Sequence, residues 1–151
     1  RNMAETFKEP SFLPDGIEHT EQPVFVTINS FEGGDNITEG ELLLVQVPTD
    51  NPADIPAYLP FGGWNDCPDT AAHTAVAKYW YETDRAVPAV LTYDTLEYRV
   101  PAPVAPEHAA ARAVEQYAYC SDIIEQGTPG MSISRLADGL RKSHIWYFWW
   151  D

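Results

Sequence analysis

The chain has 151 residues, of which 44% are hydrophobic and 13% aromatic, and its formal net charge is -14. This length fits one domain with a substantial core. The excess of carboxylates argues against binding to nucleic acid or to anionic membrane surfaces, because both are held through Lys and Arg. No apolar run reaches the roughly 20 residues of a membrane-spanning helix, and the polar first residues do not resemble a signal peptide. We therefore expect a cytoplasmic protein whose charge serves either solubility or a basic protein partner.

The first part of the chain alternates between irregular segments and two short apolar runs. Residues 1–22 have no periodicity and are expected to be irregular. The β-branched and aromatic residues of 24–28 predict a strand. The consecutive apolar residues of 42–47 predict a second strand, buried on both faces. Residues 48–60 contain four prolines, which neither a helix nor a central strand tolerates, so this segment is predicted to be a connector.

The middle of the chain predicts a helix followed by a β-hairpin. Asp69 or Thr70 caps a helix that runs to about Thr83. One stripe at helical spacing is predicted to face the core, and it consists of Ala72, Val76, Tyr79, Trp80 and Thr83. Residues 87–92 and 95–100 have the composition of strands, and the short step between them predicts a hairpin even though it lacks the usual glycine.

Two more helices are predicted after the hairpin. Pro106 suits the first position of a helix that runs to about Tyr119. Its predicted inward residues are Ala110, Ala113, Val114 and Tyr117. A shorter helix spans about Ser132 to Lys142, and three residues on one of its faces are predicted to be buried, namely Ile133, Leu136 and Leu140.

The chain closes with an unusually aromatic segment, Trp146-Tyr147-Phe148-Trp149-Trp150-Asp151. Each of these aromatic side chains has about 150–250 Å² to bury, so the segment is predicted to be fixed in the fold. As a strand over 145–150 it has aromatic residues on both faces. Such a strand is expected to be central or sandwiched between layers, because an apolar edge invites aggregation. Together the elements predict one mixed α/β (α+β) domain with a mixed sheet, about three flanking helices and a central C-terminal strand.

Four motifs stand out along the chain: LPFGGWNDCP (59–68), AVAKYWYE (75–82), EQYAYCSDIIEQG (115–127) and WYFWWD (146–151). In their order and spacing they resemble an uncharacterised bacterial family, domain-of-unknown-function family 4253. The resemblance covers about residues 42–151, so it implies a family-like domain over 42–151 and leaves residues 1–41 outside as an N-terminal segment with one strand. It implies no activity.

Cysteine, histidine and aspartate residues within or beside the motifs are the candidates for catalysis. Cys67 precedes a helix, whose positive end lowers a thiol pKa, whereas acidic neighbours oppose a thiolate, so it is either structural or reactive. Asp122 either closes a helical turn or serves a site. Either Cys67 or Cys120 could act in nucleophilic catalysis, with His73 or His144 as base and Asp66, Asp122 or Asp151 to orient it. No complete catalytic motif is present.

The same cysteines bear on metal binding and on the redox state. The spacing of Cys67, His73 and Cys120 is not a zinc-finger pattern. We therefore expect no metal and no cofactor. The two cysteines are expected to be free thiols, with a single disulfide as the alternative in an exported protein.

Six polar or aromatic residues of the motifs are candidates for binding a partner. They are Trp64, Asn65, Asp66, Tyr119, Gln126 and Asp151. The aromatic excess fits either a packed core or a partly open aromatic groove. With the acidic charge, it favours a non-enzymatic module that binds a basic protein, by analogy a toxin-neutralising, immunity-like protein. The alternative is a small hydrolase or transferase with a pocket around Trp64, Cys67 and Asp122.

Overall fold

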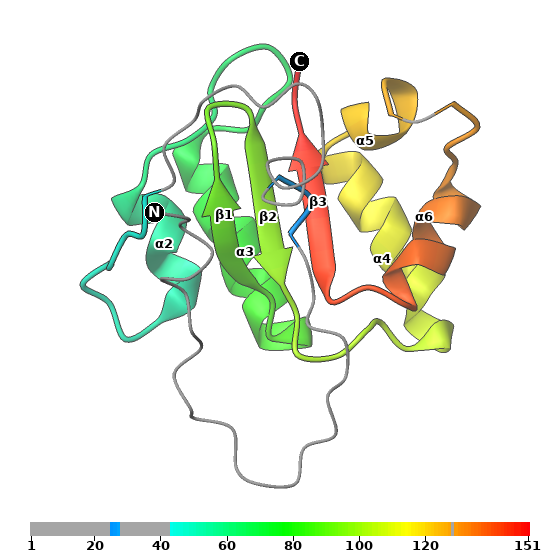
Figure 1. Ribbon diagram of the computed structural model, residues 1–151, viewed down its shortest axis with the longest axis horizontal. Helices are drawn as coiled ribbons and strands as arrows, with labels where there is room; N and C mark the ends of the chain where they lie inside the picture. The colour runs from blue at the N-terminus through cyan, green and yellow to red at the C-terminus, as the bar shows by residue number, and fades with distance from the viewer. Residues whose placement is uncertain (1–24, 28–42, 128) are drawn as a thin grey trace, which may run out of the picture.

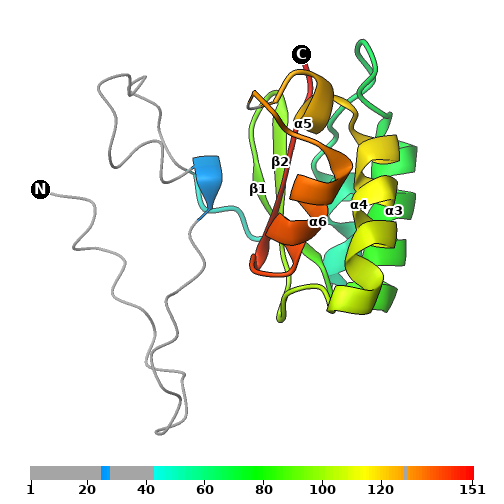
Figure 2. The ribbon, with the colours of Figure 1, turned by 90° about the vertical axis from the view of Figure 1, so that its right-hand side faces the viewer.

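A three-stranded antiparallel sheet organises the fold, and the computed structural model describes residues 25–27, 43–127 and 129–151. Two long helices, α3 and α4, lie side by side on one face of the sheet, and shorter helices flank its edges (Figure 1 and Figure 2). The predicted mixed α+β class is confirmed, but the predicted mixed sheet is wrong, because both strand pairs are antiparallel. The elements in chain order are η2 (Pro52–Asp54), α2 (Ile55–Tyr58), α3 (Thr70–Asp84), β1 (Val87–Leu91), β2 (Thr95–Arg99), α4 (Pro106–Tyr119), α5 (Asp122–Glu125), α6 (Ile133–Leu140) and β3 (Ile145–Trp149).

Helix α3 begins and ends where the sequence predicts, but it buries a different face. The Asp69 side chain accepts a hydrogen bond from the Ala72 N–H and so caps the first turn. The buried residues are His73, Ala77 and Trp80. The predicted stripe is therefore confirmed at Trp80 and at Val76, which packs against the core, and wrong at Ala72, Tyr79 and Thr83, which are exposed. Hydrophobic periodicity does not identify the buried face here, because alanines lie on both the exposed and the buried faces of α3 and because a polar histidine occupies a core position.

In helix α4, too, the buried face lies one position away from the predicted face, here toward the N-terminus. Pro106 opens the helix as predicted. The buried residues are Ala109, Arg112, Ala113 and Gln116. Of the predicted inward residues only Ala113 is buried, while Ala110 and Val114 are exposed. The apolar pattern misplaces the face because two polar side chains, an arginine and a glutamine, lie against the core. In α6, by contrast, the predicted face is confirmed, since Leu140 is buried and Ile133 and Leu136 pack on the core.

The predicted hairpin is confirmed as β1 and β2, which pair antiparallel with a register shift between Pro88 and Val90. Its turn is stabilised by side chains where a glycine would be usual. The Thr92 hydroxyl oxygen accepts hydrogen bonds from the N–H groups of Asp94 (3.3 Å) and Thr95 (3.0 Å). The Thr92 N–H in turn donates to the Thr95 carbonyl at 2.9 Å. These bonds define a turn without any positive φ in the hairpin.

The C-terminal strand, β3, lies at an edge of the sheet. The order is β1-β2-β3, so the predicted central position is wrong and β2 is the central strand. The predicted alternation is confirmed: Trp146, Phe148 and Trp150 are buried, whereas Tyr147 is exposed and Trp149 is half-buried. The edge tolerates this aromatic content because α5 and α6 flank β3 (Figure 1).

The aromatic core joins the sheet to both long helices. The Trp80 ring of α3 lies 5.0–5.5 Å, between ring centroids, from four other rings, those of Tyr98, Tyr119, Trp146 and Phe148. Most of these pairs have the edge-to-face geometry that aromatic rings prefer. The interpretation of the closing aromatic segment as core is therefore supported for its inward-facing residues.

The predictions for the first 60 residues fare worse. Residues 1–22 lie outside the described residues, as do residues 24 and 28 of the strand predicted over 24–28. Within it, Val26 and Thr27 are helical, and their N–H groups each donate to the buried Glu97 carboxylate at 2.8 Å. This bonding holds residues 25–27 to the central strand.

Residues 43–47, predicted as a buried strand, have no regular structure, and the Leu44 side chain is 88% exposed. Apolar residues alone do not make a strand when no neighbouring strand pairs with them. The connector predicted over 48–60 contains η2 and α2, because Pro52 and Pro56 sit in first turns, where proline leaves no hydrogen bond unmade.

Candidate functional site

The residues of three motifs meet at one end of the molecule, beside the C-terminal end of β3. The Asn65 side-chain N–H donates to the Asp151 carbonyl at 2.7 Å. The Asp151 N–H donates to one carboxylate oxygen of Asp122 at 3.0 Å. The other Asp122 oxygen accepts from the Gln126 side chain at 3.0 Å. This chain of hydrogen bonds brings together four of the predicted site residues. We call the end of the molecule that these four residues form the motif end.

The Gly-Gly-Trp-Asn loop reaches this position through an unusual backbone. Gly62, Gly63 and Asn65 all have positive φ, at 87°, 86° and 44°. A Cβ on Gly62 would lie 1.9 Å from the Pro68 carbonyl oxygen and 2.6 Å from the His73 ring. Only glycine therefore fits at position 62. The close approach of the loop to the His73 ring fixes where Trp64 and Asn65 are presented.

Beneath the loop, His73 links α3 to α4 through a buried chain of neutral groups. Its Nδ1 lies 2.5 Å from the Tyr119 hydroxyl, and its Nε2 lies 3.6 Å from the Cys67 sulfur. The imidazole is surrounded by the rings of Phe61, Tyr119 and Trp150 at centroid distances of 5.1–5.5 Å. Burial lowers the pKa of His73 to about 4, so the imidazole is neutral at pH 7.

Both cysteines are buried free thiols, and this excludes the alternative of a disulfide between them. Burial, reinforced by Cys120, raises the pKa of Cys67 to about 12. Burial also raises the pKa of Cys120 to about 11, and its sulfur donates to the Trp149 carbonyl at 3.0 Å. Desolvation outweighs any stabilisation from the nearby helix, so both thiols are protonated at neutral pH.

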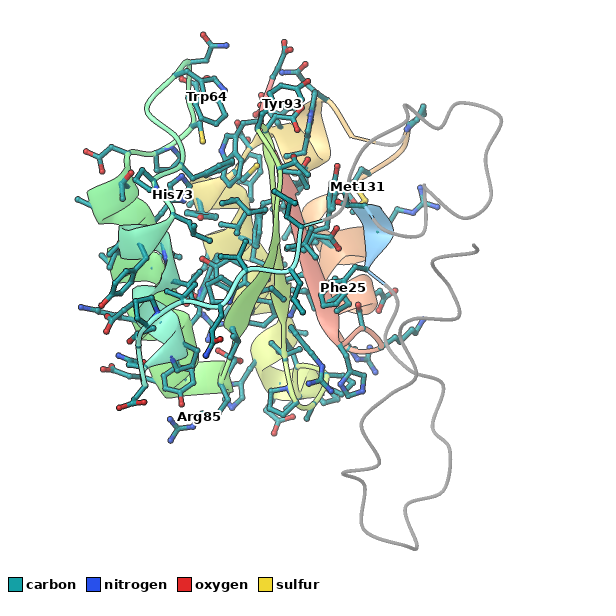
Figure 3. All side chains as sticks on the ribbon, turned by 60° about the vertical axis from the view of Figure 1, so that its left-hand side comes forward. Phe25, Trp64, His73, Arg85, Tyr93 and Met131 are labelled. Carbon is teal, nitrogen blue, oxygen red and sulfur yellow. The ribbon has the colours of Figure 1, made fainter. Side chains whose placement is uncertain are left out.

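The predicted binding residues divide into exposed and buried groups. Asn65, Asp66, Gln126 and Asp151 are exposed, and Trp64 is half-buried against Phe61 at 5.1 Å. Tyr119, in contrast, packs among core rings, and burial raises its hydroxyl pKa well above the ordinary value. Tyr119 therefore supports the site from beneath and does not present itself to a partner. Figure 3 shows Trp64 and Tyr93 at the same end of the molecule, with Arg85 at the opposite end.

A second polar cluster between the long helices has no counterpart in the sequence predictions. The Arg112 guanidinium, on α4, forms ion pairs with Asp84 at 2.5 Å and with Glu115. It also lies over the rings of Tyr79 and Trp146, 5.4 and 5.8 Å from their centroids. The only signal for it in the sequence is one arginine among alanines at an inward position. The cluster fastens α3 to α4 away from the His73 chain.

A groove of about 430 Å³ between α5, α6 and β3 is also absent from the sequence predictions. Its lining includes one buried polar residue each of α4 and α5, Gln116 and Asp122, together with residues of β3 and apolar side chains of α5 and α6. The residues that the structure describes include no cluster of three or more His, Cys, Asp or Glu side chains placed to hold a metal ion. Within the same ranges, no helix has the length and apolar character needed to cross a membrane.

Comparison with known protein families identifies a family for most of the described chain. A family model described as a domain of unknown function (DUF4253) matches residues 43–151. No curated protein and no solved structure matches the chain. The matched range contains all four motifs, and it begins one residue after the start of the range that the sequence resemblance covers.

Proposed function

The chain belongs to the DUF4253 family, and from the geometry of its motif end we propose that it is a non-enzymatic module that binds a basic protein partner. The partner would contact the surface formed by the Gly-Gly-Trp-Asn loop, the β1–β2 turn and the C-terminal residues. A toxin-neutralising, immunity-like role is the specific form of this proposal. The observation that carries it is the set of unpaired carboxylates gathered at this end.

The charges of the molecule are unevenly neutralised. Residues 43–151 contain 14 acidic and seven basic residues. The ion pairs of the described residues involve Asp54, Asp84, Glu115 and Asp138. Four other carboxylates lie around the motif end, and they belong to Asp66, Asp94, Glu125 and Asp151. None of the four has a described Lys or Arg within ion-pair distance. Unneutralised charge of one sign steers an oppositely charged partner and speeds association.

Aromatic side chains of the kind enriched at binding hot spots accompany these carboxylates. The Tyr93 side chain, at the tip of the β1–β2 turn, is 85% exposed. Trp64 presents part of its ring beside Asn65. A tyrosine or tryptophan surrounded by polar residues supplies contact area with little loss of conformational entropy. Both residues sit on backbone that internal hydrogen bonds already fix, so the surface is preorganised.

The chemistry of the buried residues gives no support to cysteine catalysis. A cysteine nucleophile needs a thiolate and a base that accepts its proton. Here Cys67 and His73 are both buried and both favour their neutral forms. The two carboxylate oxygens of Asp122 are occupied by Gln126 and by the Asp151 N–H. These residues therefore serve as supports that position the loop and the C-terminal residues.

The test is capture of a partner with the protein as bait, followed by titration of the identified protein. We expect a basic protein whose Kd weakens by about tenfold or more between about 0.05 M and 0.5 M salt. The variant Tyr93→Ala combined with Asp66→Asn should lose binding by a similar factor. The matched control is Asp138→Asn, whose carboxylate pairs with Arg141 on α6.

Two outcomes would overturn the proposal. The first is that no protein is retained at low salt, and the second is that the retained protein binds the double variant as tightly as the unaltered chain. The toxin-neutralising form requires in addition that the captured protein arrest growth when expressed alone. Co-expression with the unaltered chain should restore growth, and co-expression with the double variant should not.

A further inference from the structure

The groove beside β3 has the size and the wall composition of a ligand site. Its volume of about 430 Å³ falls within the range of roughly 300–1,000 Å³ that is usual for small-molecule pockets. Apolar side chains of α5, α6 and the loop before α6 form its walls, among them Ile123, Met131 and Leu136. Met131 lies beside the first turn of α6 (Figure 3). The opposite wall is β3, so the groove follows the edge of the sheet.

The backbone of β3 directs unpaired groups into this groove. The Val100 N–H donates to the His144 carbonyl, and the Trp150 N–H donates to the Asp94 carbonyl. With the observed register, these bonds place residues 146 and 148 in the hydrogen-bonded pairs. The backbone groups of the alternate residues therefore point away from β2. Of those alternate residues, Tyr147 and Trp149 line the groove.

This edge is too short to accept an added peptide strand. The N–H and carbonyl of Ile145 are bonded to the Ser143 hydroxyl, at 3.0 and 2.7 Å. The Trp149 carbonyl accepts from Cys120. Among the described residues, no hydrogen-bond partner is found for the Tyr147 N–H and carbonyl or for the Trp149 N–H. Strand addition needs a longer run of donors and acceptors, whereas two neighbouring N–H groups suit a ligand with an acceptor group.

Two buried side chains add further donors to the same lining. Gln116 and Trp146 line the groove, and each is 1% exposed. In the part of the chain that the structure describes, the Gln116 amide nitrogen and the Trp146 indole nitrogen have no hydrogen-bond partner. Buried donors are nearly always paired in folded proteins, so two orphans in one lining indicate a missing acceptor.

An arginine adds a positive charge to the hydrogen-bond donors of the groove. The Arg135 guanidinium lines the groove and donates to the Gly130 carbonyl at 3.0 Å. No described carboxylate lies within ion-pair distance of it, whereas Arg141 on the same helix pairs with Asp138. The acidic residue of the lining is Asp122, whose oxygens accept hydrogen bonds from Gln126 and Asp151.

We propose that this groove binds a small carboxylate with an apolar body. The carboxylate interacts with Arg135 and with the unpaired N–H groups, and the apolar body packs against the walls of α5 and α6. The excess of donors over acceptors selects an anion over a neutral amide. The groove shares Asp122 and Gln126 with the motif end, but this proposal does not depend on the proposed function, because the ligand contacts Arg135, β3 and the walls of α5 and α6.

Octanoate is the first probe and 3-phenylpropionate the second, each titrated into the full-length protein while the indole N–H resonance of Trp146 is followed by NMR. We expect saturable shifts of that resonance with at least one probe. The neutral analogue 1-octanol should bind about tenfold more weakly or worse, since it lacks the charge-assisted bonds. Trp146→Phe identifies the resonance.

The variant Arg135→Gln should weaken binding of the carboxylate by about tenfold, and Arg135→Lys should restore part of the loss. Arg141→Gln is the matched control and should bind as the unaltered chain does. Circular dichroism checks that each variant is folded. The proposal is overturned if neither carboxylate shifts the Trp146 resonance, or if Arg135→Gln and 1-octanol leave the affinity unchanged.

Discussion

Two buried polar clusters fasten α3 to α4, and they do so with opposite chemistry. Near the motif end, His73 of α3 meets Tyr119 of α4 in a chain of neutral groups. The other cluster pairs Asp84 of α3 with Arg112 of α4 through full charges. Trp80 lies between them, since its ring contacts Tyr119 and its indole N–H approaches Glu115 at 3.5 Å.

The difference shows what each cluster requires of its surroundings. The neutral chain tolerates complete burial because no charge has to leave water, and the cost is only that every donor must find an acceptor. The charged cluster stays near the surface, where the Glu115 side chain keeps 38% of its exposure, because desolvating a guanidinium and two carboxylates is expensive. The fold thus places the neutral network beneath the loop, where His73 and Cys67 are buried from water.

The largest effect is expected from Trp150→Ala, which removes the ring that covers the neutral chain. Trp150 contacts Phe61, His73 and Tyr119 at centroid distances of 5.4–5.6 Å. Loss of a buried tryptophan should reduce the free energy of unfolding by about 3–5 kcal/mol. Urea titration measures it. Tyr93→Ala, at an exposed position, is the control and should change little. Equal stability of the two variants would contradict the core role of Trp150.

The charged cluster is tested next by Arg112→Met. This change leaves Asp84 and Glu115 without their cation, and we expect a loss of about 2–4 kcal/mol in unfolding free energy. The exposed pair of Arg141 and Asp138 provides the control, since Arg141→Met should cost less than about 1 kcal/mol. Adding Asp84→Asn to Arg112→Met should recover part of the loss, because it removes an uncompensated charge. A further loss in the double variant would show that charge is not the cause.

The neutral chain is tested directly by Tyr119→Phe, which deletes one hydroxyl and keeps the ring. His73 Nδ1 then lacks its partner, and an unsatisfied buried group costs about 1–3 kcal/mol. Tyr117→Phe is the matched control, because its hydroxyl bonds Glu125 at the surface. Thermal unfolding compares the two. If both variants melt together, the bond between His73 and Tyr119 adds nothing to stability.

Local signals predict the elements of this fold well and their faces poorly. The Asp69 cap, Pro106 at a first helical position and the aromatic run at the end are strong short-range signals, and the corresponding helices and strand form as predicted. The inward faces of α3 and α4 are misplaced because His73 and Arg112 are buried. A polar residue is accepted in a core when partners distant in the sequence satisfy it, and hydrophobic periodicity does not contain those partners.

The candidate site shows the same limit. The sequence singles out Asn65, Asp122, Gln126 and Asp151, but not the bonds among them, since Asn65 and Asp151 are separated by 86 positions. It also leaves Cys67 as either structural or reactive, whereas its burial in the fold favours the neutral thiol. The groove arises from packing of α5 and α6 against β3, and no motif encodes that space.

The smallest expected effect is the pH dependence that the neutral chain confers. Folding lowers the pKa of His73 from its ordinary value near 6.5 to about 4, so between these values the unfolded chain binds a proton that the folded chain does not. Stability is therefore complete above about pH 6.5 and falls as the pH falls toward 4. Between about pH 6.5 and 5 we expect a loss of about 1 kcal/mol.

Urea titrations at several pH values measure this slope, and His73→Gln should flatten it. Carboxylates add their own dependence mainly below about pH 5, so the window above that value isolates the histidine. His108→Gln, at an exposed position of α4, should keep the slope of the unaltered chain. If His73→Gln also keeps the pH slope of the unaltered chain, burial does not hold the imidazole neutral. The cluster around His73 would then not differ from the Arg112 cluster in the way described.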